Sequence, residues 1–312
     1  MPEWSDFVPE LACLGVDLVI TAIFCKCYEN ANKVVRDLNN ATQLNIDSGL
    51  KDGIRGHPEA VTDEATDTVT LPYVALRGIV TPLGDRSITS LYSQRSVEGV
   101  IQRVVFKQHG KKMYRGMWMD TTRTLNDMTN HVPFCLADTG YGGLFSAAAK
   151  PFVEVMDWKE AARVDMETVH DEFVSHSASI GQHLWDHIIE GEMTRGVQKT
   201  ETMLTSGATI TGVGKVVLGP MGVKLLPPED GKSFFLVESL KSLIKEQTDN
   251  RNFHKILVYT FSGLGLFLGG YMTWKYLNIR KREAEVRQDL VLFSSLRSNS
   301  ISFNWLYTAI LL

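Results

Sequence analysis

An uncharged stretch near the end of the chain constrains the fold more than any other feature. Residues 256–274 read ILVYTFSGLGLFLGGYMTW and contain no charged side chain. As a helix rising about 1.5 Å per residue, the stretch would be about 28 Å long, close to the ~30 Å hydrocarbon core of a bilayer. Lys255 and Lys275 flank it, and Tyr271 and Trp274 lie near one end, where aromatic rings favour the headgroup region. It predicts a transmembrane helix; the alternative, a buried helix of a soluble core, normally keeps a polar stripe.

A weaker apolar run lies near the N-terminus. Residues 11–25 read LACLGVDLVITAIFC and include Asp17, whose burial in lipid costs about 2.5–3.5 kcal/mol. A cleaved signal peptide needs a basic leading segment, but residues 1–10 carry carboxylates and no Lys or Arg. We therefore expect a second membrane helix, assigned to residues 11–27, with a peripheral or cleaved segment as the alternative.

The rest of the composition is typical of a chain folded in water. Of the 312 residues, 44% are hydrophobic and 22% are charged, which disfavours a transporter with many membrane helices. The net charge of −4 gives no basis for a nucleic-acid partner. Membrane lipid is therefore the first partner that the sequence predicts.

Cysteine usage excludes a disulfide-stapled fold. Cys13, Cys25 and Cys27 lie in or beside the N-terminal run, and only Cys135 lies in the middle of the chain. A single cysteine cannot form a disulfide within that region, and we expect no cysteine-based zinc site there. The Cys25-x-Cys27 pair fits lipidation, metal binding or a chance juxtamembrane pair.

Between the two apolar runs the pattern favours strands. Residues 28–44 read as a helical extension, and residues 47–70 read as a linker or loop. Expected strands cover residues 73–80, 99–108, 113–119, 133–137, 152–158, 208–218, 223–226 and 234–237, with a hairpin turn at residues 219–222. Expected helices cover residues 179–190, 194–204 and 238–247, with a charged helical continuation at 276–296. The predicted fold class is α+β: a β-rich soluble domain with a few helices, held between two transmembrane helices.

Sequence motifs assign no catalytic, cofactor-binding or metal-binding residue. Residues 212–215 (GVGK) do not match the phosphate-loop pattern G-x-x-x-x-G-K-[ST]. Counted from Gly207, the pattern fits Gly212 but requires Lys where the chain has Val213, and no Ser or Thr follows Lys215. His183 and His187 stand four residues apart on an expected helix, but no third ligand follows, so a solvated helix face is favoured. Residues 40–42 form a glycosylation sequon, which matters only in the secretory lumen. The tryptophans of the middle region are expected in the core or in a groove: Trp118, Trp158 and Trp185.

Several blocks of the middle region resemble a known family. They are LPYVALRGIV (71–80), GVIQRVVFKQH (99–109), TNHVPFCL (129–136), METVHDEF (166–173), IIEGE (188–192), GVQKTETMLTSGATITGVGKVVL (196–218) and VKLLPP (223–228). In this order, and between two apolar runs, they are similar to the mitochondrial ubiquitin ligase activator of NF-kappa-B family, also called mitochondrial-anchored protein ligases. The resemblance extends over roughly residues 5–290.

This resemblance implies a topology. The family has two helices in the mitochondrial outer membrane, both termini in the cytosol and a β-rich domain in the intermembrane space. The expected domains are a tail (1–10), a transmembrane helix (11–27), an extension and linker (28–70), the β-rich domain (71–250), a transmembrane helix (256–274) and a cytosolic charged helix with an apolar tail (275–312). Basic residues do not decide the orientation: those after the first run favour a cytosolic loop, and those around the second are nearly balanced.

The resemblance also implies a function, with one departure. The family contains RING-type ubiquitin-protein ligases that modify mitochondrial fusion and fission proteins and so control mitochondrial organisation. Their terminal RING is folded by zinc on Cys and His ligands. This sequence has no cysteine after Cys135. We therefore expect a RING-less form that binds no zinc or other cofactor and is inactive as a ligase by itself.

Two readings of this departure stay open. In the first, the sequence is the anchored part of a complete ligase whose last exon is missing from it. In the second, it is an inactive regulatory or partner-binding isoform that competes with or scaffolds the full-length ligase through the membrane helices. Small surfaces suited to such helix packing are offered by Gly263, Gly265, Gly269 and Gly270.

Overall fold

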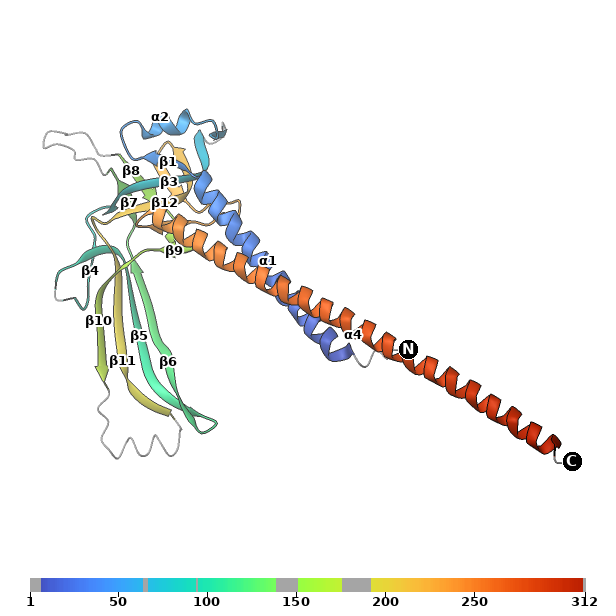
Figure 1. Cartoon of the computed structure of the whole chain (residues 1–312). Coiled ribbons are helices and arrows are strands. Elements are labelled where there is room, and N and C mark those ends of the chain that lie inside the picture. The colour runs from blue at the N-terminus through green and yellow to red at the C-terminus, as the bar shows by residue number, and fades with distance from the viewer. Residues whose placement is uncertain (1–6, 64–66, 94, 139–150, 176–191, 311–312) are drawn as a thin grey trace, which may run out of the picture. The chain divides into compact units, whose positions relative to one another are not determined.

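The structure consists of two units, each described by itself (Figure 1). This computed structural model describes residues 7–63, 67–93, 95–138, 151–175 and 192–310. One unit, Met1–Val35 with Glu246–Leu312, holds most of two long helices, α1 (Val8–Asn40) and α4 (Leu240–Ile310). The other unit, Arg36–Lys245, holds the strands. The prediction of a β-rich domain between two long apolar helices is confirmed at this level.

Both long helices extend beyond the runs that predicted them. α1 includes residues 28–40 of the expected helical extension, but the end of that extension was predicted wrongly, because residues 42–45 form a strand that pairs with β3 (Thr68–Pro82). α4 joins most of the predicted segments 238–247, 256–274 and 276–296 into one continuous helix. Both are long and apolar enough to cross a membrane, and only 6% and 0% of their most apolar windows are buried. A core helix of a soluble protein would be mostly buried, so this exposure disfavours that alternative.

Five strands of the second unit close on themselves as a small barrel. The pairings β3–β7, β7–β8, β8–β13, β13–β12 and β12–β3 complete the ring. Its members are β3 (Thr68–Pro82), β7 (Phe134–Ala137), β8 (Phe152–Val155), β12 (Thr209–Gly219) and β13 (Gly222–Leu226). Closure leaves no free edge along the ring, which protects it from pairing with other chains.

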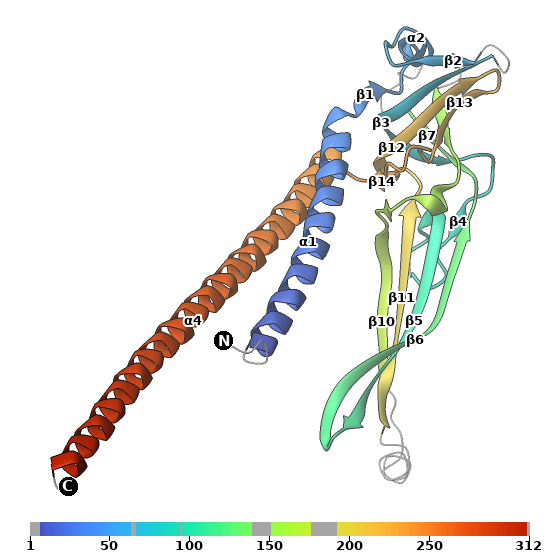
Figure 2. The same cartoon turned by 90° about the vertical axis from the view of Figure 1, so that its right-hand side faces the viewer.

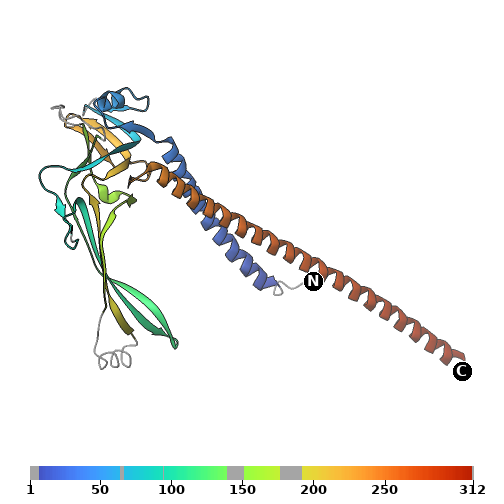
Figure 3. The same ribbon diagram turned by 60° about the vertical axis from the view of Figure 1, so that its left-hand side comes forward.

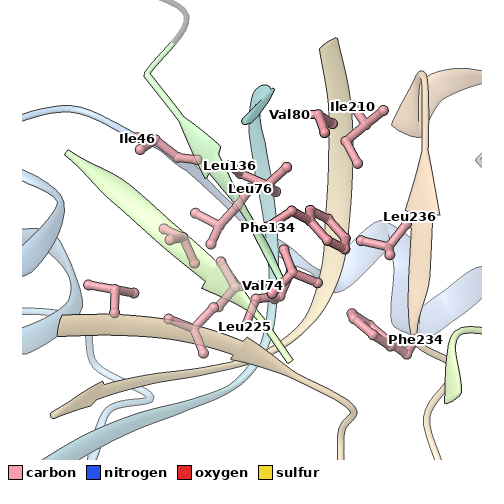
Figure 4. Packing of buried hydrophobic residues seen from close by; sticks show 14 of the residues in the cluster. Ile46, Val74, Leu76, Val80, Phe134, Leu136, Ile210, Leu225, Phe234 and Leu236 are labelled. Atoms are coloured by element: carbon pink, nitrogen blue, oxygen red, sulfur yellow. The ribbon is translucent and has the colours of Figure 1, made fainter. Parts of the chain in front are cut away.

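The hydrophobic core lies inside this barrel. Leu76, Leu136 and Leu225 come from three different strands and are fully buried (Figure 4). Phe134 and Phe234 fill the same cluster. Buried and less buried residues alternate along β13 and β8, so there the period-two pattern of the sequence translates directly into the core, whereas residues 210–214 of β12 are all buried.

Short elements extend the barrel sheet. They are β1 (Thr42–Asn45) and β2 (Val61–Asp63) on β3, β14 (Phe235–Val237) on β12, and β9 (Arg163–Val164) on β14. A helix, α2 (Leu50–Arg55), stands where a linker was expected. That expectation was wrong there because Leu50 and Ile54 join the core cluster. Their apolar spacing was hidden among Gly and Asp residues.

A second sheet projects from the barrel, and we call it the finger sheet. Its long strands are β5 (Glu98–Tyr114), β6 (Met117–His131), β10 (Glu167–Ser175) and β11 (Glu192–Thr205), all antiparallel and side by side in Figure 2. The short strand β4 (Ile88–Thr89) pairs with the start of β5. Val100, Ile101 and Leu204 at the base belong to the barrel core, so the sheet is rooted in it.

Two sequence predictions in the finger sheet were wrong. Residues 113–119 are not one strand, because Arg115 and Gly116 have φ of 49° and 82° and form a two-residue turn between β5 and β6. Residues 194–204 are not a helix but most of β11, where long-range pairing with β5 overrides a helix-compatible pattern. The remaining strand predictions are confirmed within a few residues. The expected strand 152–158 is shorter than predicted: β8 ends at Val155, and residues 158–160 form a 3₁₀ helix, η2 (Trp158–Glu160). The predicted hairpin turn at residues 219–222 is also confirmed.

Candidate functional site

The stretch that superficially resembles a phosphate loop lies inside strand β12. Gly212 and Gly214 face the packed core, and a Cβ atom on Gly214 would lie 2.6 Å from the carbonyl oxygen of Leu226. Lys215 is held by Glu229, with Nζ 2.6 Å from Oε1. The strand interpretation is confirmed, and these glycines serve close packing of the barrel.

The other sequence candidates fall in different places. His183, His187 and Trp185, and the helix expected at 179–190, lie outside the described residues. Trp158 packs edge-on against His131 with 5.4 Å between ring centroids, and Trp118 is half-buried on β6. Across the part of the chain that the structure describes, no three His, Cys, Asp or Glu side chains are arranged to hold a metal ion.

Cys135 is a buried thiol on β7. Its burial, with a smaller effect of the nearby Glu154 carboxylate, raises the pKa of the Cys135 thiol. A thiol with a raised pKa is a poor nucleophile, so Cys135 behaves as a core residue. The cysteines of α1 are also free thiols, and the sequence alternatives for Cys25 and Cys27 stay open.

The first unit contains a pair of antiparallel helices, visible in Figure 1. Near one end Lys275 Nζ lies 2.6 Å from Glu10 Oε1, and further along the rings of Phe24 and Phe261 stack with centroids 5.4 Å apart. Between these contacts Asp17 of α1 faces Gly265 of α4. We call this set of contacts the helix pair.

Both helices turn a seven-residue repeat toward each other. In α1 the less exposed positions include 10, 14, 17, 21, 24, 28, 31 and 35, and in α4 they include 254, 258, 261, 265, 268, 272, 275 and 279. Spacings that alternate between three and four residues are typical of helices packed along a coiled-coil seam. Of the four glycines expected to support packing, Gly265 lies in this seam, whereas Gly263, Gly269 and Gly270 have open space around them.

Asp17 is the unusual residue of the helix pair. It is 5% exposed, its Oδ1 has no hydrogen-bond partner among the described residues, and a Cβ on Gly265 would lie 2.6 Å from its Oδ2. One turn later the Thr21 hydroxyl is also buried without a partner. An unsatisfied buried polar group costs about 1–3 kcal/mol, and ionisable residues inside membrane helices mark functional positions. The place of Asp17 in an apolar run marks it in the sequence, whereas nothing in the sequence marks the surface of α4 that it faces.

A buried carboxylate organises the base of the finger sheet. Glu201 on β11 is fully buried and accepts hydrogen bonds from the Gln102 amide at 2.6 Å and the Ser90 hydroxyl at 2.7 Å. It also accepts the backbone N–H groups of Leu91 and Tyr92 at 2.9 and 3.1 Å. Burial by itself would raise the pKa of Glu201, but these donors outweigh it and lower the pKa. Glu201 thereby fixes the loop after β4 onto β11 and β5.

A polar cleft lies where strands β5 and β6 meet η2 and β9. It is lined by residues that include Arg103, Asp127, Thr129, Trp158 and Met166. Arg103 donates two hydrogen bonds to Asp127, at 2.9 and 2.6 Å, and this pairing lowers the pKa of the Asp127 carboxyl. The ion pair is already satisfied, and these lining residues include no nucleophile with an adjacent base.

Comparison with known proteins identifies relatives. A family model described as GIDE, E3 ubiquitin ligase, matches residues 103–269, which is just over half of the chain. These residues span the finger sheet, most of the barrel and the start of α4 with its apolar run. No solved structure matches the chain.

Individual relatives extend the match over most of the chain. "Mitochondrial E3 ubiquitin protein ligase 1" of Drosophila melanogaster is 28% identical over 90% of this chain and 77% of its own length. "Mitochondrial ubiquitin ligase activator of nfkb 1-A" of Danio rerio is 30% identical over 91% of this chain and 80% of its own length. The Homo sapiens relative of similar name is 30% identical over 80% of this chain and 66% of its own length.

Proposed function

This chain belongs to the GIDE family of E3 ubiquitin ligases, and from this premise we propose that it is the membrane-anchored part of a ubiquitin ligase of the mitochondrial outer membrane. One observation carries the proposal. The β-rich domain covered by the family match is bracketed in the chain by two helices that are long and apolar enough to cross a bilayer. The names of the relatives describe them as mitochondrial.

We propose that α1 and α4 both span the outer membrane. Both termini would then face the cytosol, and the barrel and finger sheet would lie in the intermembrane space. The antiparallel helix pair supports this topology, because two antiparallel spans return the chain to the side from which it started. Mitochondrial fusion and fission proteins, the substrates implied by the family resemblance, would be reached from the cytosolic side.

Protease protection tests this topology in isolated mitochondria. One variant carries an epitope tag at the N-terminus, and a matched variant carries it in the exposed β3–β4 connection at residues 84–86. We expect protease to remove the terminal tag at once and the internal tag only after the outer membrane is ruptured. Removal of the internal tag from intact mitochondria would contradict the proposal.

A regulatory role is the second candidate. The 312 residues include no cysteine after Cys135, whereas a RING needs cysteine ligands for its zinc. These residues alone therefore lack the cysteines that would hold the zinc of a RING, the domain through which a ligase docks a ubiquitin-loaded conjugating enzyme. We propose that in this form the chain binds partners of the family or pairs with a full-length ligase in the membrane.

Reconstituted ubiquitination distinguishes the two candidates. This chain and the full-length Danio rerio relative are placed in vesicles, separately and together, with activating enzyme, conjugating enzyme and ubiquitin. We expect no transfer by the chain alone and reduced self-ubiquitination of the relative when the chain is in excess. A variant with residues 256–274 replaced by leucines keeps an anchor and serves as the control. Equal inhibition by that variant, or none by the native chain, would contradict pairing through the membrane helices.

A further inference from the structure

The end of the β5–β6 hairpin is unusually apolar for an exposed part of the domain. We call residues 111–119 (KKMYRGMWM) the hairpin tip. Met113, Tyr114, Met117 and Met119 are 43–68% exposed, and Trp118 is half-buried. A soluble domain rarely gathers this much apolar surface at one point unless the surface has a partner.

The shape of the tip narrows the kind of partner. Tyr114 pairs with Met117 and Met113 with Trp118 across the turn at Arg115 and Gly116. Because successive side chains of a strand point to opposite faces, apolar groups stand on both faces of the hairpin. Figure 3 shows the green hairpin projecting as a narrow end. An end with apolar side chains on both faces fits a deformable surface such as a lipid interface.

The charge of the tip further restricts the kind of surface that it can bind. Lys111, Lys112 and Arg115 lie within the tip and no carboxylate does, although Glu192 of β11 stands opposite Lys112 in register and the whole chain carries a net charge of −4. Asp120, at the base of the tip, lies 3.4 Å from Arg195 and so has a basic partner of its own. Arg115 also lies over the Tyr114 ring, 5.4 Å from its centroid. Basic, aromatic and methionine side chains together suit the boundary between anionic headgroups and acyl chains.

We propose that the hairpin tip is a lipid-binding element that inserts its apolar side chains into the headgroup region of an anionic bilayer. Lys111 and Arg115 pair with the lipid phosphates, each contributing about a fivefold gain in binding. Met113, Tyr114, Met117 and Met119 leave water, with a gain of roughly tenfold for a methionine that is fully withdrawn. The end of the finger sheet that lies far from the barrel thereby contacts a membrane.

An environment-sensitive fluorophore at the tip tests this proposal on the full chain. The four native cysteines are replaced by alanine, and Met117→Cys is labelled with bimane. The chain is held in nanodiscs of phosphatidylcholine, or of phosphatidylcholine with phosphatidylglycerol. Anionic nanodiscs alone test contact with the chain's own membrane, and neutral nanodiscs mixed with anionic vesicles test contact with a second membrane. Incorporation into the nanodisc tests the anchoring of α1 and α4 separately from the tip.

The expected result is a blue shift of bimane emission in at least one anionic arm and none with neutral lipid alone. A matched label at Met128→Cys, exposed on β6 outside the tip, should show no shift. Adding Lys111→Glu and Arg115→Glu should raise the anionic lipid needed for a half-maximal shift roughly 25-fold or more. Absence of a shift in both anionic arms, or an equal shift at position 128, would overturn the proposal.

Discussion

Single residues decide how closely the two long helices approach. Gly265 has no side chain, so the Asp17 side chain of α1 lies directly against the backbone of α4. A Cβ atom at position 265 would collide with the Asp17 carboxylate. Small residues at helix crossings allow close approach, which stabilises packing where no hydrophobic effect acts between helices. Asp17 restricts the pair because its polar oxygen fits one register of α1 against α4.

We expect Gly265→Leu to separate the helix pair and Gly263→Leu to leave it intact. The first side chain would meet Asp17, with an overpacking cost of about 1–3 kcal/mol, whereas Gly263 has nothing within 4 Å. Cross-linking between Phe24→Cys and Phe261→Cys, in a chain without native cysteines, measures the pairing. Asp17→Ala should partly rescue Gly265→Leu. Equal cross-linking in the two leucine variants would contradict this account.

Glu201 is a buried carboxylate in the second unit, as Asp17 is in the first. Its hydrogen bonds hold the ionised form, so its pKa is lower in the folded chain than in the unfolded chain. The stabilisation is present above the unfolded value of about 4.3 and is lost as pH falls through the folded pKa. Glu201 thus makes the base of the finger sheet acid-sensitive.

We expect Glu201→Gln to lower the free energy of unfolding by about 1.5–3 kcal/mol at neutral pH, because donors that served a charged acceptor lose it. The variant should also lose less stability than the native chain when pH falls below about 4.3. Thermal unfolding followed across a pH series checks both expectations. Glu229→Gln, at an 81% exposed side chain paired with Lys215, is the control and should change little.

At the scale of elements, the turn between β5 and β6 sets the register of the finger sheet. Arg115 and Gly116 both adopt positive φ, the geometry of a two-residue turn whose twist matches that of the flanking strands. Gly116 adopts this conformation readily, whereas Arg115 does so at a cost. A glycine in the middle of an apparent strand was the signal for this turn.

Glycine-to-alanine changes should therefore have opposite signs in two elements. We expect Gly116→Ala to destabilise the chain by about 1 kcal/mol, because its φ of 82° disfavours a side chain. Gly53→Ala, in helix α2 with open space around it, should stabilise by up to about 1 kcal/mol. Denaturant unfolding of the two variants measures both. A shift in the same direction for both would contradict the geometry.

Other elements resisted prediction for a common reason. Strand β6 is exposed along nearly all its length, so its polar sequence carries no alternation of buried and exposed residues. The sequence of residues 194–204 predicts a helix instead of strand β11, because the pairing of β11 with β5 and β10 is not visible in a local pattern. Barrel strands such as β3 and β12 were predictable because burial imposes an apolar pattern on them. The candidate site followed the same rule: Asp17 stood out in an apolar run, and Glu201 did not.

For the whole molecule, the proposed anchoring depends on the apolar run of α4. Leu266 lies in this run and is 79% exposed in the absence of lipid. We expect Leu266→Arg to weaken insertion, because arginine at the centre of a span costs about 2.5–3.5 kcal/mol. Retention in alkali-washed mitochondrial membranes measures insertion. Asn278→Arg, beyond the run, is the matched control, and equal losses for both would argue against α4 as a span.

The sequence by itself determined the two long apolar helices, the β-rich class of the domain between them and the family. It did so because membrane-spanning length, period-two burial and ordered blocks of residues are local properties of the chain. Only the tertiary structure decided the closure of the barrel, the finger sheet and the burial of Glu201 and Asp17. Each of these depends on residues distant in sequence, as when Ser90 and Gln102 donate to Glu201 or Gly265 meets Asp17. Partners of this kind leave no local trace in a sequence, since only folding brings them together.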